Sequence, residues 1–162
     1  MKWAVRLIII AGLAAAGYWA WTVMFPNPRT VVWHRLEKLA QIASFPPNEG
    51  QIPKLAAVQK MGGYFSDQVV VNVQMTGEES HEFYNREELV QAIQAGRMSV
   101  NSVTVKFKDP NIEVTHGNQE AIIGVMLTAD INGEKNSVVE DLKIEMKKID
   151  GDWLITHVET VQ

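Results

Sequence analysis

The sequence contains no cysteine. Disulfide bonds, thiolate nucleophiles and cysteine-based zinc sites are therefore excluded, and the absence agrees with an oxidising compartment. Glycine-rich phosphate loops, serine-nucleophile elbows and histidine-based zinc motifs are missing as well. We therefore predict no cofactor and no metal site, and no motif in the chain specifies a reaction.

Basic residues are also few. The 162 residues include 15 basic and 19 acidic side chains, which gives a net charge of −4. Residues 1–28 hold Lys2, Arg6 and no acid, so the remainder carries 13 basic and 19 acidic residues, a net charge of −6. Nucleic-acid binding needs a basic patch or stripe, and the chain has none. A nucleic-acid partner is therefore not expected.

The one long apolar run covers residues 7–25, nineteen residues without a charge. As a helix it would reach roughly 28 Å, about the thickness of a bilayer core. Trp3 and the aromatic residues at 18–21 suit the two membrane interfaces. Residues 1–28 are thus predicted to be a single-pass anchor in a bacterial-type inner membrane, with residues 29–162 as an extracytoplasmic domain.

A cleaved signal peptide is the alternative for the same segment. It would use the short apolar stretch LIIIAGLAAAG and be cut near Ala14–Ala16. The apolar run, however, continues through Trp19 and Trp21, which favours a helix that stays in the membrane.

Beyond residue 28 the apolar spacing predicts helices first. Val32, Leu36 and Leu39 form the seam of one helix, which Pro46-Pro47 ends. A second helix covers 51–61, with Leu55, Val58 and Met61 on one face. Asn85 caps a third helix, for which Gly96 is the predicted stop.

The remaining segments alternate with the period of strands. Residues 69–75 and 81–85 predict a hairpin, and everything from residue 100 onward predicts a long antiparallel meander. Asp109-Pro110 indicates a bulge at a sheet edge, because proline cannot donate to the strand ladder. Three turn signals separate the strands: Gly117-Asn118, Asn132-Gly133 and Asp150-Gly151. The predicted fold class is α+β, a curved antiparallel sheet wrapped around the N-terminal helices as a cone.

Residues 30–162 resemble the nuclear transport factor 2-like (SnoaL-like, cystatin-type cone) superfamily. The resemblance rests on GGYFSDQVVVNV, on the helix NREELVQAI and on the ending DGDWLITHV. It implies a cone that often encloses a pocket, in a superfamily of isomerases, dehydratases, cyclases, binding modules and interaction domains. A spanning helix followed by such a cone also looks like the scaffold subunits of type IV secretion systems, although those chains are longer.

Three ionisable residues are candidates for catalysis. His157 and Glu159 share strand parity with Trp153, so a regular strand places all three on one face. Inside a cone the carboxylate could act as a proton-transfer base; facing outward, both groups would be solvated. Glu140 shares parity with the apolar set that follows it, and a bulge near 138–139 would turn it outward.

Aromatic residues supply the candidates for ligand contact. Tyr64, Tyr84 and Trp153 could line a pocket, and core or rim positions are the alternative. The cluster GEESHEF has metal-ligand residue types without a metal-site spacing, so a solvated hairpin tip is preferred.

The sequence therefore predicts a membrane-anchored cone that binds a small apolar ligand or a protein partner, without demonstrable catalysis. A proton-transfer lyase or isomerase and a scaffold subunit of an envelope complex are the alternatives. The outer face of AIIGVMLTADI (121–131) is apolar, which favours a homodimer that covers it.

Overall fold

The computed structural model describes residues 2–24, 26–74, 81–115, 117–133 and 138–161, with the backbone alone for 2–9 and 22–24. In chain order its elements are α1 (Lys2–Met24), α2 (Pro28–Ala43), α3 (Gln51–Gly62), β1 (Phe65–Val73), β2 (His81–Phe83), α4 (Arg86–Ser99), β3 (Val103–Thr115), β4 (Glu120–Ile131), β5 (Val138–Ile149) and β6 (Asp152–Thr160).

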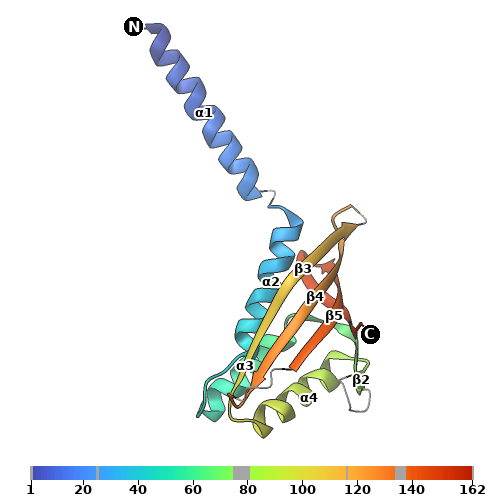
Figure 1. Ribbon diagram of the computed structural model, residues 1–162. Helices are drawn as coiled ribbons and strands as arrows, with labels where there is room; N and C mark the ends of the chain where they lie inside the picture. The colour runs from blue at the N-terminus through green and yellow to red at the C-terminus, as the bar shows by residue number, and fades with distance from the viewer. Residues whose placement is uncertain (1, 25, 75–80, 116, 134–137, 162) are drawn as a thin grey trace.

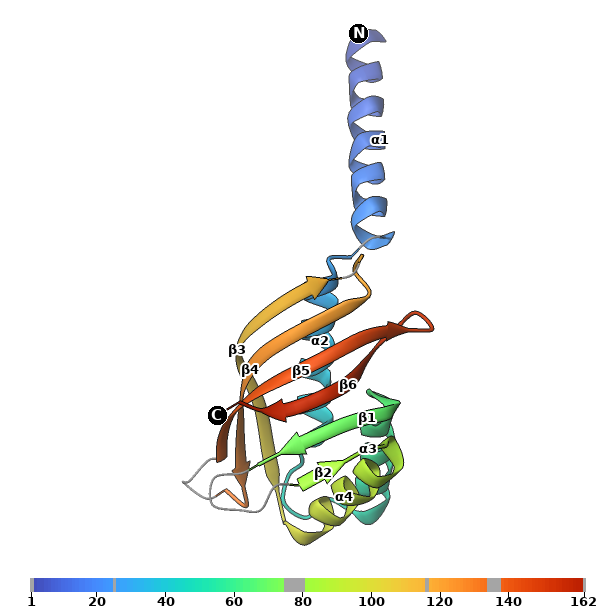
Figure 2. The same ribbon diagram turned by 90° about the vertical axis from the view of Figure 1, so that its right-hand side faces the viewer.

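The strands form one six-stranded sheet in the order β2-β1-β6-β5-β4-β3. It curves around α2, while α3 and α4 lie together beside its β1 side (Figures 1 and 2). The predicted α+β cone is confirmed. The expectation of a purely antiparallel sheet was wrong, since β1 runs parallel to β6. The chain returns to β1 only after α4 and the β3–β5 meander, and such a long crossover permits parallel pairing.

The three predicted hairpin turns have the backbone that their sequences require. Asn132-Gly133 has positive φ at both residues (55° and 70°), but it lies in a longer connection, because the β4–β5 pairing begins at Ala129 and Val138. In the tight turns, both central residues have positive φ: Gly117-Asn118 (64° and 65°) and Asp150-Gly151 (51° and 89°). These values fit type I′ turns, whose twist matches that of the flanking strands. Asp109-Pro110 also behaves as predicted, because the β3–β4 register shifts between Lys108 and Asn111 on the edge strand.

The core lies between α2 and the concave face of the sheet. Val32 and Leu36 are fully buried there, against Ile123 of β4 and Met146 of β5. The predicted seam of α2 is thus confirmed. On α3, Val58 and Met61 are buried as predicted, but Leu55 is 42% exposed, since the helix packs mainly against α2 and α4.

Helix α4 begins where its cap predicts and ends later than expected. The Asn85 side chain accepts a hydrogen bond from the Glu88 backbone N–H at 2.8 Å. The helix then continues through Gly96 to Ser99. A glycine inside a helix costs only about 1 kcal/mol relative to alanine, and the contacts of Arg97 described below hold the last turn in place.

Helix α1 extends away from the cone (Figures 1 and 2) and exposes apolar side chains such as Ile10, Leu13 and Trp19. In the part of the chain that the structure describes, no helix is long and apolar enough to cross a membrane. The anchor predicted over 7–25, whose last residue lies outside the described part, is therefore not confirmed and stays a prediction.

Candidate functional site

A bulge in β6 decides where the predicted polar pair lies. Ile155 pairs with Met146 and His157 pairs with Glu145, so Thr156 is an extra residue. Trp153, Ile155 and Val158 are buried against the core. The predicted shared face was therefore wrong: the bulge reverses the alternation after Ile155, and His157 and Glu159 lie on the outer face of the sheet.

On that outer face the two residues join an ionic network with β5. Lys143 Nζ lies 3.0 Å from Glu159 Oε1 and 3.3 Å from Glu145 Oε1. His157 Nε2 lies 3.4 Å from Glu159 Oε2. The hydrogen bond from Lys143, and then that from His157, lowers the pKa of the Glu159 carboxyl. A carboxylate with a lowered pKa is a weaker base, so this environment does not favour general-base chemistry.

Glu140 is separated from that pair by the sheet. The β4–β5 register runs without a shift from Glu120↔Lys147 to Ala129↔Val138, so the proposed bulge near Val138 is absent from this pairing. Glu140 pairs with Leu127, which packs against the core, and shares parity with buried Leu142. The three catalytic candidates thus do not converge.

The predicted tyrosines have different surroundings. Tyr64 packs against the core, and the Arg35 guanidinium carbon lies 4.9 Å from the centre of its ring. Tyr84 is 61% exposed and donates a short hydrogen bond to the Glu82 carboxylate, which raises the pKa of the Tyr84 hydroxyl. Neither residue lines a cavity described below.

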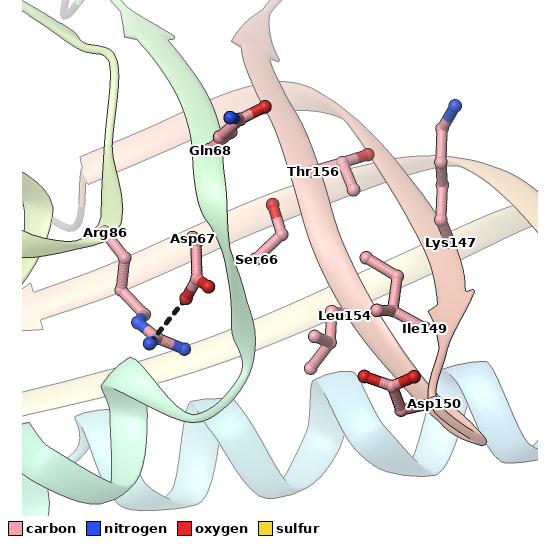
Figure 3. Close-up of a pocket in the computed structure, with 9 residues that line it drawn as sticks. All are labelled: Ser66, Asp67, Gln68, Arg86, Lys147, Ile149, Asp150, Leu154 and Thr156. Atoms are coloured by element: carbon pink, nitrogen blue, oxygen red, sulfur yellow. Dashed lines mark ion pairs between the residues drawn. The ribbon is translucent and has the colours of Figure 1, made fainter.

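One hollow is an open groove of about 580 Å³ on the outer face of the sheet (Figure 3). Its walls come from the first half of β1, from β6, from the end of β5 with the following turn, and from Arg86 at the start of α4. The groove opens where β6 bulges and the β1–β6 register shifts between Phe65 and Val70. Its charged groups are largely paired, Arg86 with Asp67 and Lys147 with Glu120. Among the described residues that line it, the groove therefore offers no free acid–base pair.

A second hollow of about 420 Å³ lies at the base of α1. Pro26, Asn27 and Pro28 border it, together with residues of the two neighbouring hairpin turns. Trp153, one of the predicted ligand contacts, forms part of its wall but is only 5% exposed. Its main contact is with the core.

The third hollow is smaller and almost wholly apolar. It measures about 220 Å³ and lies between α4 and β3, at the end of the molecule furthest from α1 (Figure 1). Its lining residues are apolar except for one arginine; they are Ala43, Phe45, Met61, Ile93, Gly96, Arg97, Val100, Val103 and Val105. We refer to it as the apolar pocket.

Arg97 lines the apolar pocket and connects three segments around it. Its side chain is 4% exposed and forms a bidentate ion pair with Glu49, with contacts of 2.9 and 3.2 Å to the two carboxylate oxygens. Nη1 donates to the carbonyls of Ile42 and Ala43 at the end of α2. The guanidinium carbon lies 4.2 Å from the centre of the Phe45 ring. The charge is thus neutralised by Glu49, and the donors are satisfied.

The apolar pocket was not predicted from the sequence, although one signal for it is present there. Leu89, Ile93 and Arg97 lie four residues apart, so the arginine continues the apolar stripe of α4. A charged residue at such a position needs a partner. The partner, Glu49, lies 48 residues away in a linker, and no local pattern identifies it.

Within the described residues, no group of histidine, aspartate and glutamate could hold a metal ion. In the GEESHEF cluster, Glu78 and Glu79 lie outside the described part of the chain. Glu82 accepts hydrogen bonds from Asn72 and Tyr84.

Comparison with known proteins identifies the fold. No protein-family model and no curated protein matches the sequence. A nuclear transport factor 2-like protein of unknown function from Pseudomonas putida KT2440 superposes with a TM-score of 0.64 and 7% identity, over 80% of this chain and 82% of that one. A protein from Novosphingobium aromaticivorans provisionally named a scytalone dehydratase superposes with a TM-score of 0.60 and 11% identity, over 83% of this chain and 84% of that one. A Nostoc punctiforme protein with a cystatin-like fold superposes with a TM-score of 0.52 and 19% identity, over 68% of this chain and 86% of that one.

These likenesses show that the chain has the nuclear transport factor 2-like, cystatin-like fold. At such low identities they establish the fold alone, because this fold hosts many unrelated functions.

Proposed function

We propose that the protein is a non-catalytic binding module that takes a small apolar group into the apolar pocket. The observation that supports this proposal is the lining: eight apolar residues surround one arginine whose charge Glu49 neutralises. Burial of apolar surface is the main favourable term that such a lining offers, at roughly 25 cal/mol per Å². The pocket is smaller than the roughly 300 Å³ at which pockets for drug-sized ligands begin, so a single ring or a short branched chain fits it best.

The enzyme alternative has less support. Its three candidate residues are divided between the two faces of the sheet, and none lines the apolar pocket. A proton-transfer enzyme needs an acid or base within hydrogen-bond reach of its substrate. The neighbour named for a dehydratase shares only the fold, so its name does not decide the matter.

Gly96 allows a direct test of the apolar pocket. A Cβ at Gly96 would meet no atom within 4 Å, so Gly96→Leu places a side chain at the pocket without a backbone clash. The change also raises helix propensity by roughly 0.8 kcal/mol, so α4 should not be destabilised. We expect Gly96→Leu to abolish binding of small neutral aromatic amides such as 3-(4-fluorophenyl)propanamide, measured by ¹⁹F ligand-observed NMR.

Ala95→Leu is the matched control. Ala95 is exposed, adjacent to Gly96 and absent from the pocket lining. Ala95→Leu therefore adds the same leucine side chain outside the pocket. Binding should survive in this variant. Equal binding by wild type and Gly96→Leu would contradict the proposal, as would a lack of binding by the wild type.

We further propose that residues 7–25 attach this module to a bacterial-type inner membrane, with the cone on the extracytoplasmic side. The support is the sequence itself: nineteen uncharged residues flanked by aromatic and basic residues. The attachment would hold the apolar pocket at the end of the cone away from the bilayer, where a ligand or a partner side chain can enter it.

A homodimer through the outer face of the sheet is also part of this proposal. Ile122 is 38% exposed on that face, beside the ionic network of Lys143, Glu145 and Glu159. An isologous contact, in which the same surface meets itself, would cover this exposed side chain. A monomer at high protein concentration, measured by analytical ultracentrifugation, would contradict it.

A further inference from the structure

Lys54 places an uncompensated positive charge beside the apolar pocket. Its ammonium nitrogen lies 5.3 Å from the centre of the Phe45 ring and 3.4 Å from the Arg97 carbonyl oxygen, and both residues line the pocket. The 3.4 Å contact is longer than a good N–H···O hydrogen bond, so it satisfies the ammonium poorly.

The neighbouring charges leave that ammonium unbalanced. Arg97 and Glu49 neutralise each other through three hydrogen bonds. Among the residues that the structure describes, Lys54 forms no ion pair of its own. One net positive charge therefore remains at the rim of an otherwise apolar pocket, where partial burial strengthens its attraction for an anion.

We propose that the ligand of the apolar pocket is a small carboxylate with a compact apolar body. Its ring or branched chain occupies the space between α4 and β3, and its carboxylate meets the Lys54 ammonium at the rim. A lysine suits this role because its flexible stem can bring a point charge to the anion from its position beside the Phe45 ring. The inference rests on the proposed function and specifies the chemical class that the same pocket accepts.

The experiment compares acids with their neutral amides on the full-length protein in lipid nanodiscs, with empty nanodiscs as the blank. The probes are 3-(4-fluorophenyl)propionate and its amide, together with the same pair built on a cyclohexyl ring. We expect each acid to bind roughly fivefold more tightly than its amide, the factor that a half-exposed ion pair supplies. The acid's advantage should shrink in 0.5 M salt, because salt screens exposed charges.

Lys54→Gln should reduce the ratio of acid to amide affinity to about one. Lys60→Gln is the matched control: it removes the same charge from the same helix, further along the chain from the contact with Phe45, and should leave the ratio unchanged. The ratio reports charge recognition, so a general loss of folding would not reproduce it.

The two proposals fail in different ways. Amides that bind equally well to wild type and Gly96→Leu contradict the pocket itself. Amides that bind in the pocket, with acids binding no better or with Lys54→Gln leaving their advantage intact, overturn the carboxylate inference alone. If neither acid nor amide binds, both proposals are wrong.

Discussion

At the scale of single residues, Arg97 is a buried charged side chain that needs a partner of opposite charge. Its guanidinium is almost fully buried, and the Glu49 side chain opposite is only 16% exposed. Removing one partner of a buried pair leaves the other charge without compensation and typically costs about 3–5 kcal/mol. We expect Arg97→Ala to lower the free energy of unfolding by about 3 kcal/mol, measured by urea denaturation.

Arg86→Ala provides the comparison for that measurement. Arg86 also pairs with an acid, Asp67, but the two side chains are 44% and 80% exposed. An exposed pair contributes about 0–1 kcal/mol, so this variant should stay close to wild type. A double change of Glu49→Leu with Arg97→Met should recover part of the loss, since it leaves no unpaired charge. Similar losses for Arg97→Ala and Arg86→Ala would contradict the assigned role.

Single residues also show which structural features the sequence can predict and which it cannot. Caps, turns and seams depend on residues close in the chain, and Asn85, Asp150-Gly151 and Leu36 all behave as their local patterns predict. The apolar pocket depends on Glu49, Lys54 and Arg97, which come from a linker and two helices. Only the tertiary fold brings these three together.

At the scale of elements, two bulges differ in how visible they are in the sequence. The one in β3 contains Pro110, which cannot donate to a ladder and so reveals its position. The one in β6 falls at Thr156, a residue with high strand propensity. Nothing in WLITHVET indicates that the alternation reverses there, and this is why the prediction that His157 and Glu159 share a face with Trp153 was wrong.

The β6 bulge leads to a prediction about deletions. Removing Thr156 leaves Ile155 inward, His157 outward and Val158 inward, the alternation of a regular strand. The shortened strand should therefore fold with one cooperative thermal transition, at a reduced midpoint. Removing Leu154 instead displaces Trp153 from the core or distorts the turn before it. Either change should lower the free energy of unfolding by roughly 3–5 kcal/mol.

Circular dichroism melts of the two deletion variants check this prediction. Each lacks one residue of the same strand, so chain length is matched. A midpoint for the Thr156 deletion as low as that for the Leu154 deletion would show that the bulge itself is needed, for example to keep the outer groove open.

At the scale of the whole molecule, the order of segments ties position to function. Helix α1 lies at one end of the molecule, and α4 lies at the other with the start of β3 (Figure 1). The apolar pocket is lined by residues from α4 and β3. If residues 7–25 enter a bilayer, α2 continues from that anchor into the cone, and the pocket faces away from the membrane. The small volume of the pocket then suits either a free carboxylate or one side chain of a neighbouring protein.

Attachment can be tested on the full-length chain by placing charge within the apolar run. Each arginine at the centre of a spanning helix costs roughly 2.5–3.5 kcal/mol on insertion, so Ala14→Arg with Ala15→Arg should prevent stable integration. The matched control, Ala14→Leu with Ala15→Leu, keeps the run apolar. After alkaline carbonate washing of membranes, wild type and control should remain in the pellet, and the double arginine variant should move to the supernatant. Release of the wild type, or an intact mass showing that the chain starts beyond Ala16, would contradict the anchor and favour a cleaved signal peptide.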